Sequence, residues 1–397
     1  MNLKGKCVLL GVTGGIAAYK IANLASMLVK AGADTRVVMT ENATHFINPI
    51  TFETLTSHKC LVDTFDRDFE FNVEHVALAK LADVILVAPA TANTMAKIAH
   101  GMADNMLTTT ILASSAPKLI APAMNTGMYE NPVTQDNMAL LREYGWEIIE
   151  PSEGHLACGD SGKGKMVEPS VLFSYIEKTV AHKKDMEGIH LLVTAGPTVE
   201  SIDPVRYITN HSSGKMGYAI AKAAMLRGAS VTLVSGPTAL TPPIGVEYVP
   251  IETAKDMYEA VTSRSGKMDI IIKAAAVADY RPANIATEKV KKTDGEMSIA
   301  LERTDDILAF LGKNKKTHQF LCGFSMETEN MLENSKKKLT AKNLDMIVAN
   351  NLKVEGAGFN TSTNIVTLIT PDDCMKLPIM DKEDVAMTLL DEILKRR

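Results

Sequence analysis

Glycines and a threonine that could hold a phosphate follow the first apolar run of the chain. Residues 7–10 lead directly into Gly11, Thr13, Gly14 and Gly15. A turn between a strand and a helix favours phosphate, because its backbone N–H groups and the positive end of the helix dipole face the ligand. The spacing GxxGG differs from the GxGxxG of dinucleotide sites and predicts a mononucleotide site; a bare tight turn is the alternative.

Hydroxyl and amide side chains are concentrated in two later segments of the first half. Residues 88–94 read APATANT and follow an apolar run, and residues 104–110 read DNMLTTT. Such groups suit the heteroatoms of a flavin ring, which needs several hydrogen-bond partners. Each segment, taken singly, is more typical of an ordinary helix cap than of a flavin site.

Three further features of the first half could carry catalysis. His75 precedes an apolar helical pattern, and Asn125 ends the run PAMN. Residues 154–166 read GHLACGDSGKGKM, a glycine-rich segment that contains Cys158. Such a segment could close over a substrate, and Lys163 and Lys165 could lower the pKa of the thiol. The alternatives are a histidine with a structural role and a disordered surface loop.

The second half contains a polar segment too long for a simple turn. Residues 194–217 separate a strand pattern from a helix pattern and include Arg206, Asn210 and Lys215. Ser212, Ser213 and Gly214 could cap the following helix, whose N-terminus would be a second anion site. The next strand ends at Ser235 and Gly236. An acidic residue is expected at such a position in an NAD site, so its absence argues against a dinucleotide oxidoreductase.

Lysines near further strand ends indicate a triphosphate. Residues 273–280 read KAAAVADY and offer Asp279 after small residues that permit close backbone approach. Residues 288–292 read EKVKK, in which Lys289 and Lys291 share one side of an extended chain. Lys338 and Lys342 share one helical face. Lysine acts as a point charge on phosphate, although alternating lysines are also typical of a solvated strand edge.

The elements that must position these residues alternate between strand and helix. Strand patterns are read from apolar runs, and helix patterns from apolar residues at helical spacing. The expected strands are residues 7–10, 36–39, 83–88, 118–121, 190–194, 231–234, 269–274, 319–323, 345–349 and 365–369. The expected helices include residues 16–30, 215–226, 331–342 and 383–397. The fold class is therefore α/β, with two Rossmann-like domains, each an open, mainly parallel sheet with helices on both faces.

Length and composition fit a two-domain enzyme. The chain has 397 residues, 46% of them apolar, and a formal net charge of −5. A chain of this length divides into more than one domain, and residues 181–187 are the expected linker. The charge does not suggest a nucleic-acid partner, and no apolar stretch is long enough for a bilayer, so we expect a cytoplasmic protein. The five scattered cysteines indicate free thiols, with Cys7, Cys322 and Cys374 expected in apolar surroundings.

His75, the PAMN run and the LACGDSGKGKM segment together resemble the flavin-containing cysteine decarboxylases. The whole chain resembles the bacterial bifunctional phosphopantothenoylcysteine decarboxylase/phosphopantothenate-cysteine ligases of coenzyme A biosynthesis. The resemblance implies decarboxylase residues 1–186 and ligase residues 187–397. It also implies FMN, contacted by Gly11, Thr13, Gly14, Gly15, Thr40, Thr91, Ala92, Asn93, Met106 and Thr108.

The resemblance further implies the decarboxylation chemistry. In the family, FMN oxidises the cysteine end of the substrate towards a thioaldehyde, which makes loss of carbon dioxide feasible, and the enethiol is then reduced. Cys158 is the implied proton donor, and His75 the implied base beside the flavin. Asn125 would hold the substrate carboxylate, with Met124 nearby. A neutral amide orients a carboxylate without strongly stabilising the ground state.

For the second half, the resemblance implies a ligase in which the carboxylate of 4'-phosphopantothenate attacks CTP. Cysteine then displaces CMP from the acyl-cytidylate. Asn210 would stabilise the activated acyl group and Arg206 would bind phosphopantothenate, while Mg²⁺ offsets the triphosphate charge. The CTP residues carried over are Lys273, Ala274, Ala275, Asp279, Lys289, Asp305, Asp306, Ile307, Leu308, Phe324, Lys338 and Lys342.

Family resemblance also implies a homo-oligomer, a dodecamer built from trimer contacts in the first domain and dimer contacts in the second. Two alternatives remain at this stage. One domain could be degenerate, leaving a single activity, or the chain could be a flavin-binding regulatory protein without turnover.

Overall fold

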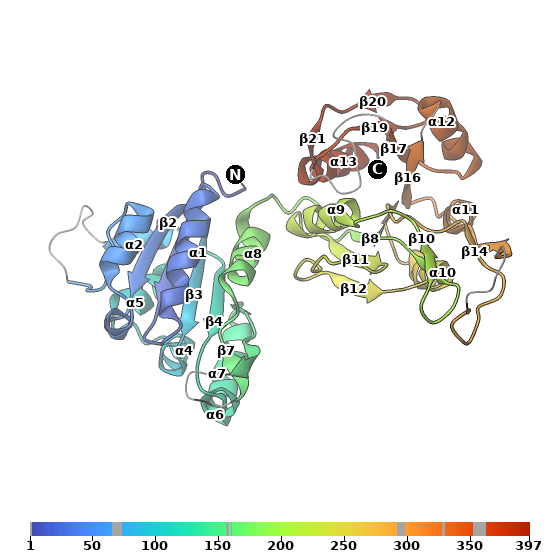
Figure 1. Ribbon diagram of the computed structural model, residues 1–397. Helices are drawn as coiled ribbons and strands as arrows, with labels where there is room; N and C mark the ends of the chain where they lie inside the picture. The colour runs from blue at the N-terminus through green and yellow to red at the C-terminus, as the bar shows by residue number, and fades with distance from the viewer. Residues whose placement is uncertain are drawn as a thin grey trace. The chain divides into compact units, whose positions relative to one another are not determined.

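The computed structural model divides the chain into two compact units, Met1–Lys183 and Lys184–Arg397. It describes residues 2–65, 74–155, 159, 161–291, 298–327, 330–351 and 363–397. Cys158 and Lys292 lie outside the described residues, so the structure does not place them. Each unit is described below by itself (Figure 1).

The first unit is built on a five-stranded parallel sheet with the order β2-β1-β3-β4-β5. Its strands are β1 (Cys7–Val12), β2 (Asp34–Met39), β3 (Val84–Ala90), β4 (Lys118–Pro122) and β5 (Glu147–Ile148), followed by an antiparallel hairpin of β6 (Ser152–His155) and β7 (Ser161–Lys165). The helices are α1 (Ala18–Lys30), the 3₁₀ helix η1 (Glu41–His45), α2 (Pro49–Thr56), α3 (Glu74–Leu81), α4 (Ala92–Ala99), α5 (Met106–Ala113), α6 (Thr126–Glu130), α7 (Pro132–Glu143) and α8 (Pro169–Val180).

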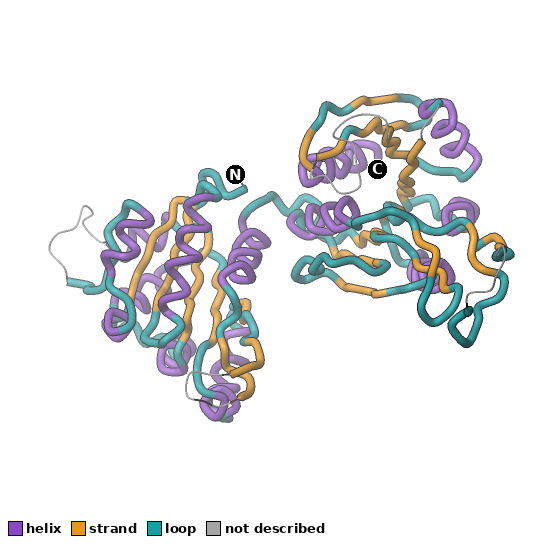
Figure 2. Tube along the Cα trace, in the orientation of Figure 1, coloured by secondary structure: helices purple, strands orange, loops and turns teal. Residues whose placement is uncertain are grey.

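Alternation along the strands creates one hydrophobic layer on each face of this sheet. In β1, Val8 and Leu10 pack in one cluster with helices α1, α2 and α8. Leu9 faces the opposite way and packs with α3, α4, α5 and α7. Successive side chains of a strand point to opposite faces, so an all-apolar strand requires helices on both. Figure 2 shows the strands of the unit between these helices.

The second unit is built on an eight-stranded sheet with the order β12-β11-β8-β13-β16-β17-β19-β20. All neighbours are parallel except β17 with β19 and β19 with β20. The strands of this sheet are β8 (His190–Ala195), β11 (Ser230–Ser235), β12 (Glu247–Pro250), β13 (Ile270–Lys273), β16 (Phe320–Glu327), β17 (Met346–Asn351), β19 (Val366–Ile369) and β20 (Cys374–Lys376). Three short pairs join β9 (Val199–Ser201) to β10 (Tyr207–Thr209), β14 (Tyr280–Pro282) to β15 (Leu301–Arg303), and β18 (Thr363–Asn364) to β21 (Met380–Asp381).

Helices cover both faces of this second sheet as well. The helices are α9 (Lys215–Leu226), α10 (Ala254–Ser265), α11 (Ile307–Lys313), α12 (Met331–Ala341) and α13 (Lys382–Arg396). Helices α9 and α13 share one hydrophobic cluster with the sheet. Helices α10, α11 and α12 contribute to the cluster on the other face. Val385, Leu389 and Ile393 of α13 are fully buried, as their spacing predicts.

The predicted fold class is confirmed, but two local expectations were wrong. The ends of the glycine-rich segment 154–166 form the β6–β7 hairpin instead of a loop. The two units divide between Lys183 and Lys184, inside the expected linker, and Met186 at its end is already buried in the core of the second unit. Cys374 is exposed because it lies on the edge strand β20. All four described cysteines, Cys374 included, are free thiols, as expected.

Candidate active sites

A cavity of about 470 Å³ lies at the carboxyl edge of the first sheet. The chain leaves β1 towards β2 on one side and later returns to β3 on the other, so the strand order reverses between β1 and β3. Such a reversal opens a crevice for ligands beyond the strand ends. The cavity is lined by Gly14, Gly15, Ile16, Ala17, Tyr19, Lys20, Thr91, Ala92, Ala123, Met124, Asn125, Met128, His155, Gly164, Lys165 and Met166.

The turns after β1 and β3 are held together by Thr13. Its buried hydroxyl donates to the carbonyl oxygen of Pro89 at 2.6 Å and accepts from the N–H of Thr91 at 3.1 Å. Gly14 is needed for a different reason, because a Cβ there would lie 2.6 Å from the Cβ of Asn42. Thr13 therefore fixes the two turns that border the cavity but is not one of the residues that line it.

The hairpin β6–β7 reaches the cavity because two of its residues have no side chain. A Cβ on Gly164 would lie 2.3 Å from the carbonyl oxygen of Met124, and a Cβ on Gly162 would lie 2.7 Å from Oγ1 of Thr126. The N–H of Met124 donates to the carbonyl of Gly164 at 3.0 Å. The hairpin therefore lies directly against Met124 and Asn125.

Basic and hydroxyl groups also surround this cavity. His155 Nδ1 lies 2.8 Å from the hydroxyl oxygen of Ser161, and Lys20 pairs with Glu168 at 2.7 Å. Asn125 caps the short helix α6 by accepting from the N–H of Gly127 at 2.8 Å. Sequence reasoning missed His155 and Lys20; the only signals were the glycine-rich segment around the histidine and the position of Lys20 in the helix after Gly15.

Other predicted flavin residues of the first unit do not line this cavity. Helices α4 and α5 are capped by Thr91, which does line the cavity, and by Asn105. A helix cap was the alternative interpretation of residues 88–94 and 104–110. Gly11 lies within β1, where a Cβ would meet Leu107 at 2.6 Å. The remaining described residues outside the lining are Thr40, Asn93, the buried Met106, Thr108 and the half-buried His75.

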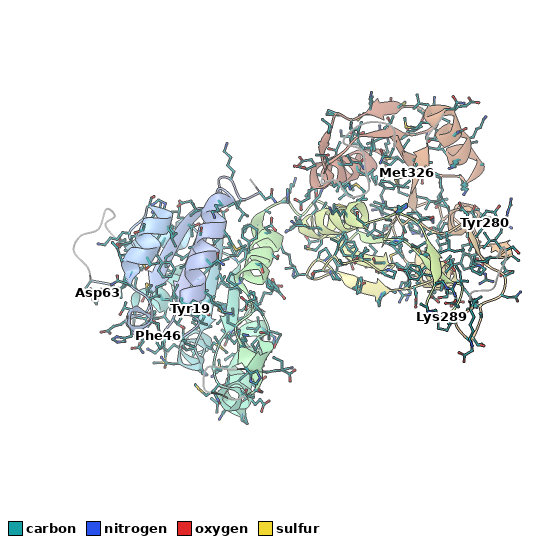
Figure 3. The ribbon with its side chains drawn as sticks, in the orientation of Figure 1. Tyr19, Phe46, Asp63, Tyr280, Lys289 and Met326 are labelled. Atoms are coloured by element: carbon teal, nitrogen blue, oxygen red, sulfur yellow. The ribbon has the colours of Figure 1, made fainter. Side chains whose placement is uncertain are left out.

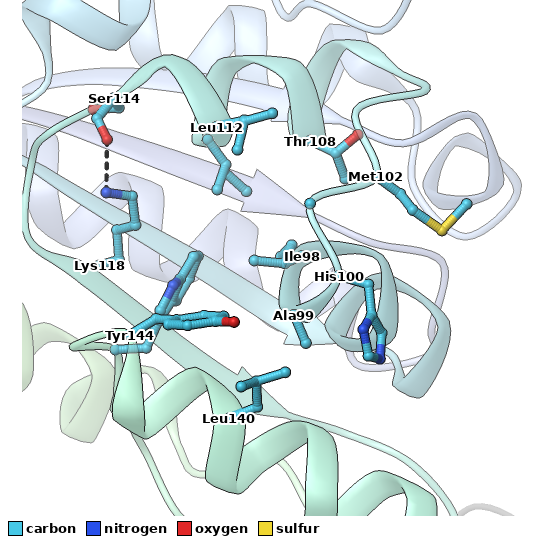
Figure 4. A pocket seen from close by; sticks show the side chains of 13 residues that line it. Ile98, Ala99, His100, Met102, Thr108, Leu112, Ser114, Lys118, Leu140 and Tyr144 are labelled. Carbon is cyan, nitrogen blue, oxygen red and sulfur yellow. Dashed lines mark hydrogen bonds between the residues drawn. The ribbon is translucent and has the colours of Figure 1, made fainter.

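Thr108 instead lines a separate cavity of about 550 Å³ on the α4–α5 side of the sheet (Figure 4). Leu140, Tyr144 and Trp146 form much of its apolar wall. Lys118 lies at one end and donates to the carbonyl oxygen of Ser114 at 2.7 Å. The pKa of Lys118 is lowered because the amine is partly buried. Thr108 is thus separated from the predicted flavin residues that line the first cavity within one copy of the chain.

The second unit has a larger cavity, of about 840 Å³, at the carboxyl edge of its sheet. The strand order of this sheet reverses between β8 and β13, so the same rule places a ligand there. The structure brings together predicted residues from five separate segments in its lining. These are Asn210, Lys273, Ala274, Ala275, Asp279, Asp305, Asp306, Ile307, Leu308, Phe324, Lys338 and Lys342.

The N-terminus of α9 opens into this second-unit cavity. Gly214, at φ +74°, occupies the N-cap position as expected, but the side chains expected to cap the helix, Ser212 and Ser213, do not cap it. Ser212 instead accepts from the N–H of Gly214 at 3.3 Å. Gly214, Lys215 and the two residues after them all line the cavity. The first N–H groups of this helix are therefore available to an anion.

Asn210 connects two of the loops that form the cavity. Its Nδ2 donates to the carbonyl oxygens of Ala276 at 3.3 Å and Val277 at 3.1 Å. The N–H of Ala275 donates to the hydroxyl of Thr194 at 3.1 Å. With both amide donors engaged by the 276–277 backbone, Oδ1 is the atom that Asn210 can offer to a ligand donor.

Burial, and after it the neighbouring charges, set the pKa of Lys273. Burial lowers its pKa to about 8, and the positive charge of Lys342 acts in the same direction, while Asp306 and Asp279 oppose them. Lys342 pairs with Asp306 at 2.8 Å. Burial alone would raise the pKa of Asp306. The pKa is nevertheless lowered, because the carboxylate accepts hydrogen bonds from the Lys342 amine and from the N–H of Ala309. Lys273 and Lys342, which both lie near Asp306, give this side of the cavity a positive charge that suits phosphate.

Arg206 and Lys289 do not belong to the described lining of this cavity. Arg206 pairs with the buried Asp203 at 2.8 Å and donates to the carbonyl of Val290. Lys289 is exposed on the same loop (Figure 3). Arg206 thus fastens the lysine loop to the 203–206 turn, while the roles predicted for both residues stay predictions.

Three residues that sequence reasoning missed also line this cavity: Asn350, Asn364 and Lys382. Asn350 lies at the end of β17, so its position at a strand end was a usable signal. Lys382 is the first residue of α13, a position from which a side chain can reach ligands at the helix N-terminus.

Gly236, at the end of β11, has no room for a side chain. A Cβ there would lie 1.7 Å from the carbonyl oxygen of Pro197. This contact gives a physical reason for the missing acidic residue noted in the sequence.

Clusters of metal-ligating side chains and membrane-spanning helices are both missing from the part of the chain that the structure describes. Within residues 2–65, 74–155, 159, 161–291, 298–327, 330–351 and 363–397, no three His, Cys, Asp or Glu side chains are grouped to hold a metal ion. Among the same residues, no helix has the length and apolar character needed to cross a membrane.

Comparisons with known proteins cover both units. Residues 1–181 match the family described as Flavoprotein, and residues 186–396 match the DNA/pantothenate metabolism flavoprotein C-terminal domain. The Coenzyme A biosynthesis bifunctional protein CoaBC of Bacillus subtilis is 50% identical over 98% of this chain and 97% of its own. The protein of that name from Escherichia coli is 43% identical over 100% of this chain and 98% of its own. The solved C-terminal domain of a CoaBC protein is 48% identical, covering 52% of this chain and 95% of that domain, with a TM-score of 0.45.

Proposed function

Since the chain belongs to the family of bifunctional coenzyme A biosynthesis proteins, we propose that its first-unit cavity serves decarboxylation and its second-unit cavity serves ligation. The protein is a bifunctional enzyme that joins cysteine to 4'-phosphopantothenate and decarboxylates the product to 4'-phosphopantetheine. The observation that carries this conclusion is the match to CoaBC proteins along almost the whole chain. The family matches to both halves also argue against the alternative in which one domain is degenerate and only one activity remains.

For decarboxylation, the first-unit cavity fits a flavin. Its lining includes glycines at the N-terminal side of α1 and the cap of α4, which suit the phosphate and ring atoms of FMN. Bound FMN supplies the oxidation and re-reduction that make loss of carbon dioxide feasible. Asn125 orients the substrate carboxylate, and the β6–β7 hairpin excludes water while Cys158 donates a proton. His75 and Met124 remain proposed participants.

For ligation, the second-unit cavity fits a nucleoside triphosphate, which we propose to be CTP. The uncapped end of α9 and the lysines 273, 338 and 342 bind phosphate oxygens. The small side chains of Ala274 and Ala275 permit close approach of the base. The phosphopantothenate carboxylate attacks the α-phosphorus and pyrophosphate leaves. Cysteine's nitrogen then attacks the acyl carbon, and CMP leaves.

Mg²⁺ fits the same cavity in the way it usually binds nucleotides. The ion prefers oxygen ligands and takes one or two carboxylates together with substrate phosphates. Asp279 and Asp305 both line the cavity and provide such oxygens. Bound Mg²⁺ would offset the charge of the triphosphate.

We further propose a cytoplasmic homo-oligomer, in which residues 1–186 form the decarboxylase domain and residues 187–397 the ligase domain. The free thiols support the cytoplasm as the compartment, because cysteines remain reduced there. Exposed apolar side chains at the rim of the first-unit cavity, Ile16, Tyr19 and Met128, support an oligomer. Contacts between copies would also let predicted flavin residues from separate faces, such as Thr108, act together.

The test of the proposed function measures both half-reactions on the purified protein. We expect flavin absorption, carbon dioxide release from phosphopantothenoylcysteine, and cysteine ligation that requires CTP and Mg²⁺. The His75→Asn variant should lose carbon dioxide release and keep ligation. A colourless protein that cannot be reconstituted with FMN would refute the first-unit assignment. Equal carbon dioxide release by the wild type and the His75→Asn variant would refute it as well.

The pKa of Lys273 predicts a pH dependence for CTP use. The amine is charged below pH 8 and loses its charge as the pH rises through about 8. Because the charged form binds phosphate, kcat/KM for CTP should fall roughly tenfold per unit at higher pH. The measurement is phosphopantothenate-dependent exchange of pyrophosphate into CTP, which needs no cysteine. Lys273→Arg should remain flat between pH 7 and 9, since arginine keeps its charge; an identical fall in this variant would contradict the assignment.

A further inference from the structure

One corner of the second-unit cavity contains buried polar groups that the CTP assignment does not use. Asn350, Asn364 and Lys382 are 7%, 5% and 7% exposed, and all three line the cavity. They lie near one another, because Asn350 is opposite Val366, two positions after Asn364, and Asn364 is opposite Met380, two positions before Lys382. Lys215 also lines the cavity and lies close enough to Lys382 to lower the pKa of the Lys382 amine. We call these four residues the amide-lysine corner.

Asn350 has an unmet requirement in this corner. Its Oδ1 is buried and accepts no hydrogen bond from any residue that the structure describes. A buried polar atom without a partner is costly, and native proteins seldom retain one without a reason. Since Asn350 lines a cavity, a hydrogen-bond donor on the ligand would satisfy it.

The other side chains of the corner favour an anion. Lys382 lies at the first position of α13, and its pKa is lowered by burial and by the charge of Lys215. Two cations held near each other in a partly buried site are stabilised by a negative group between them. Asn364 Oδ1 accepts from the N–H of Ile365 at 3.0 Å, so its amide N–H groups are what it can direct to a ligand.

Among the substrates, an α-amino acid meets these requirements most compactly. The ligand must present a donor and an anion within a short distance of each other. A fully ionised phosphate presents acceptors alone. An α-amino acid carries its amine and its carboxylate on one carbon, so it meets both requirements.

We propose that the amide-lysine corner binds the α-amino and α-carboxylate groups of cysteine, the second substrate of the ligase. This inference rests on the proposed ligase function. Lys382, Lys215 and Asn364 hold the carboxylate, and Asn350 accepts from the amine. The neighbouring cations disfavour the ammonium form, so the nitrogen keeps its lone pair for attack. The nitrogen then forms the amide bond to the acyl carbon, the bond to the CMP oxygen breaks, and the nitrogen releases one proton.

The experiment separates the two half-reactions of the ligase. Asn350→Leu removes the acceptor at similar volume, and Lys382→Met removes the charge while keeping an unbranched side chain. Lys395→Met is the matched control, since Lys395 lies on the same helix α13, is exposed and does not line the cavity. For each variant, exchange of pyrophosphate into CTP is measured without cysteine, and KM for cysteine is measured in the full reaction.

We expect KM for cysteine to rise about tenfold in both test variants, as for loss of one buried hydrogen bond. Exchange should stay within about twofold of wild type, which also shows that the unit has folded. A parallel loss of exchange would overturn the inference and assign the corner to a phosphate. An unchanged KM for cysteine with normal exchange would overturn it as well. Absence of exchange in the wild type would instead refute the proposed ligase chemistry itself.

Discussion

Replacing Gly164 by alanine should reduce decarboxylation by about 100-fold, the order of effect when a catalytic group is displaced by roughly 1 Å. The new Cβ would lie 2.3 Å from the carbonyl oxygen of Met124, and Gly164 has φ +137°, which side chains rarely adopt. The hairpin must therefore move away from Met124 and Asn125, opening the cavity to water. The measurement is carbon dioxide release, with ligation as an internal reference.

Gly154→Ala is the matched control for this variant. Gly154 lies in the same hairpin at φ +156°, but a Cβ there meets nothing closer than Cδ of Lys165 at 3.8 Å. The control shares the backbone strain and lacks the collision. Decarboxylation at the wild-type rate in Gly164→Ala, or equal losses in both variants, would show that close hairpin docking is not required.

Gly312→Ala should impair ligation to a similar degree, by about 100-fold, through displacement of binding groups. Gly312 lies in α11, and a Cβ there would be 1.9 Å from the carbonyl oxygen of Lys342. Helix α11 must then shift, carrying Ile307 and Leu308, which line the cavity, and straining the Asp306–Lys342 pair. Overpacking of this kind also destabilises a domain by about 1–3 kcal/mol.

The two effects of Gly312→Ala can be measured separately. Pyrophosphate exchange reports CTP use, and thermal unfolding reports stability. Gly266→Ala is the control, because Gly266 ends α10 at φ −62° and a Cβ there meets Nζ of Lys316 at 3.6 Å without collision. Carbon dioxide release should be unchanged in both variants. Normal exchange by a well-folded Gly312→Ala protein would contradict the proposed position of the nucleotide.

The sequence was sufficient for the fold and for most of the second cavity. Apolar runs and glycine stops follow from local chemistry, so helix α9 was predicted at its observed bounds. Residues such as Lys273 and Phe324 lie at ends of parallel strands, which must meet at one edge of a sheet. Their gathering in one cavity is a consequence of topology.

The remaining site residues depend on contacts that no local pattern contains. Lys382 reaches the second-unit cavity because α13 packs beside α9, although more than 150 positions separate their starts in the sequence. Asn350 is recognisable only once its burial and its lack of a described partner are known. The glycine-rich segment 154–166 was read as a loop because glycine disfavours strands, whereas Gly162 and Gly164 are needed for close docking.

The contact between Gly236 and Pro197 also limits how this fold can diverge. An enzyme with a Rossmann-like sheet could acquire a nicotinamide dinucleotide by gaining a carboxylate at the end of its second strand. Here any substitution at that position collides with backbone, which cannot swing aside as a side chain can. Neighbouring turns would have to be rebuilt first, so no single substitution at Gly236 can supply that carboxylate to the ligase unit.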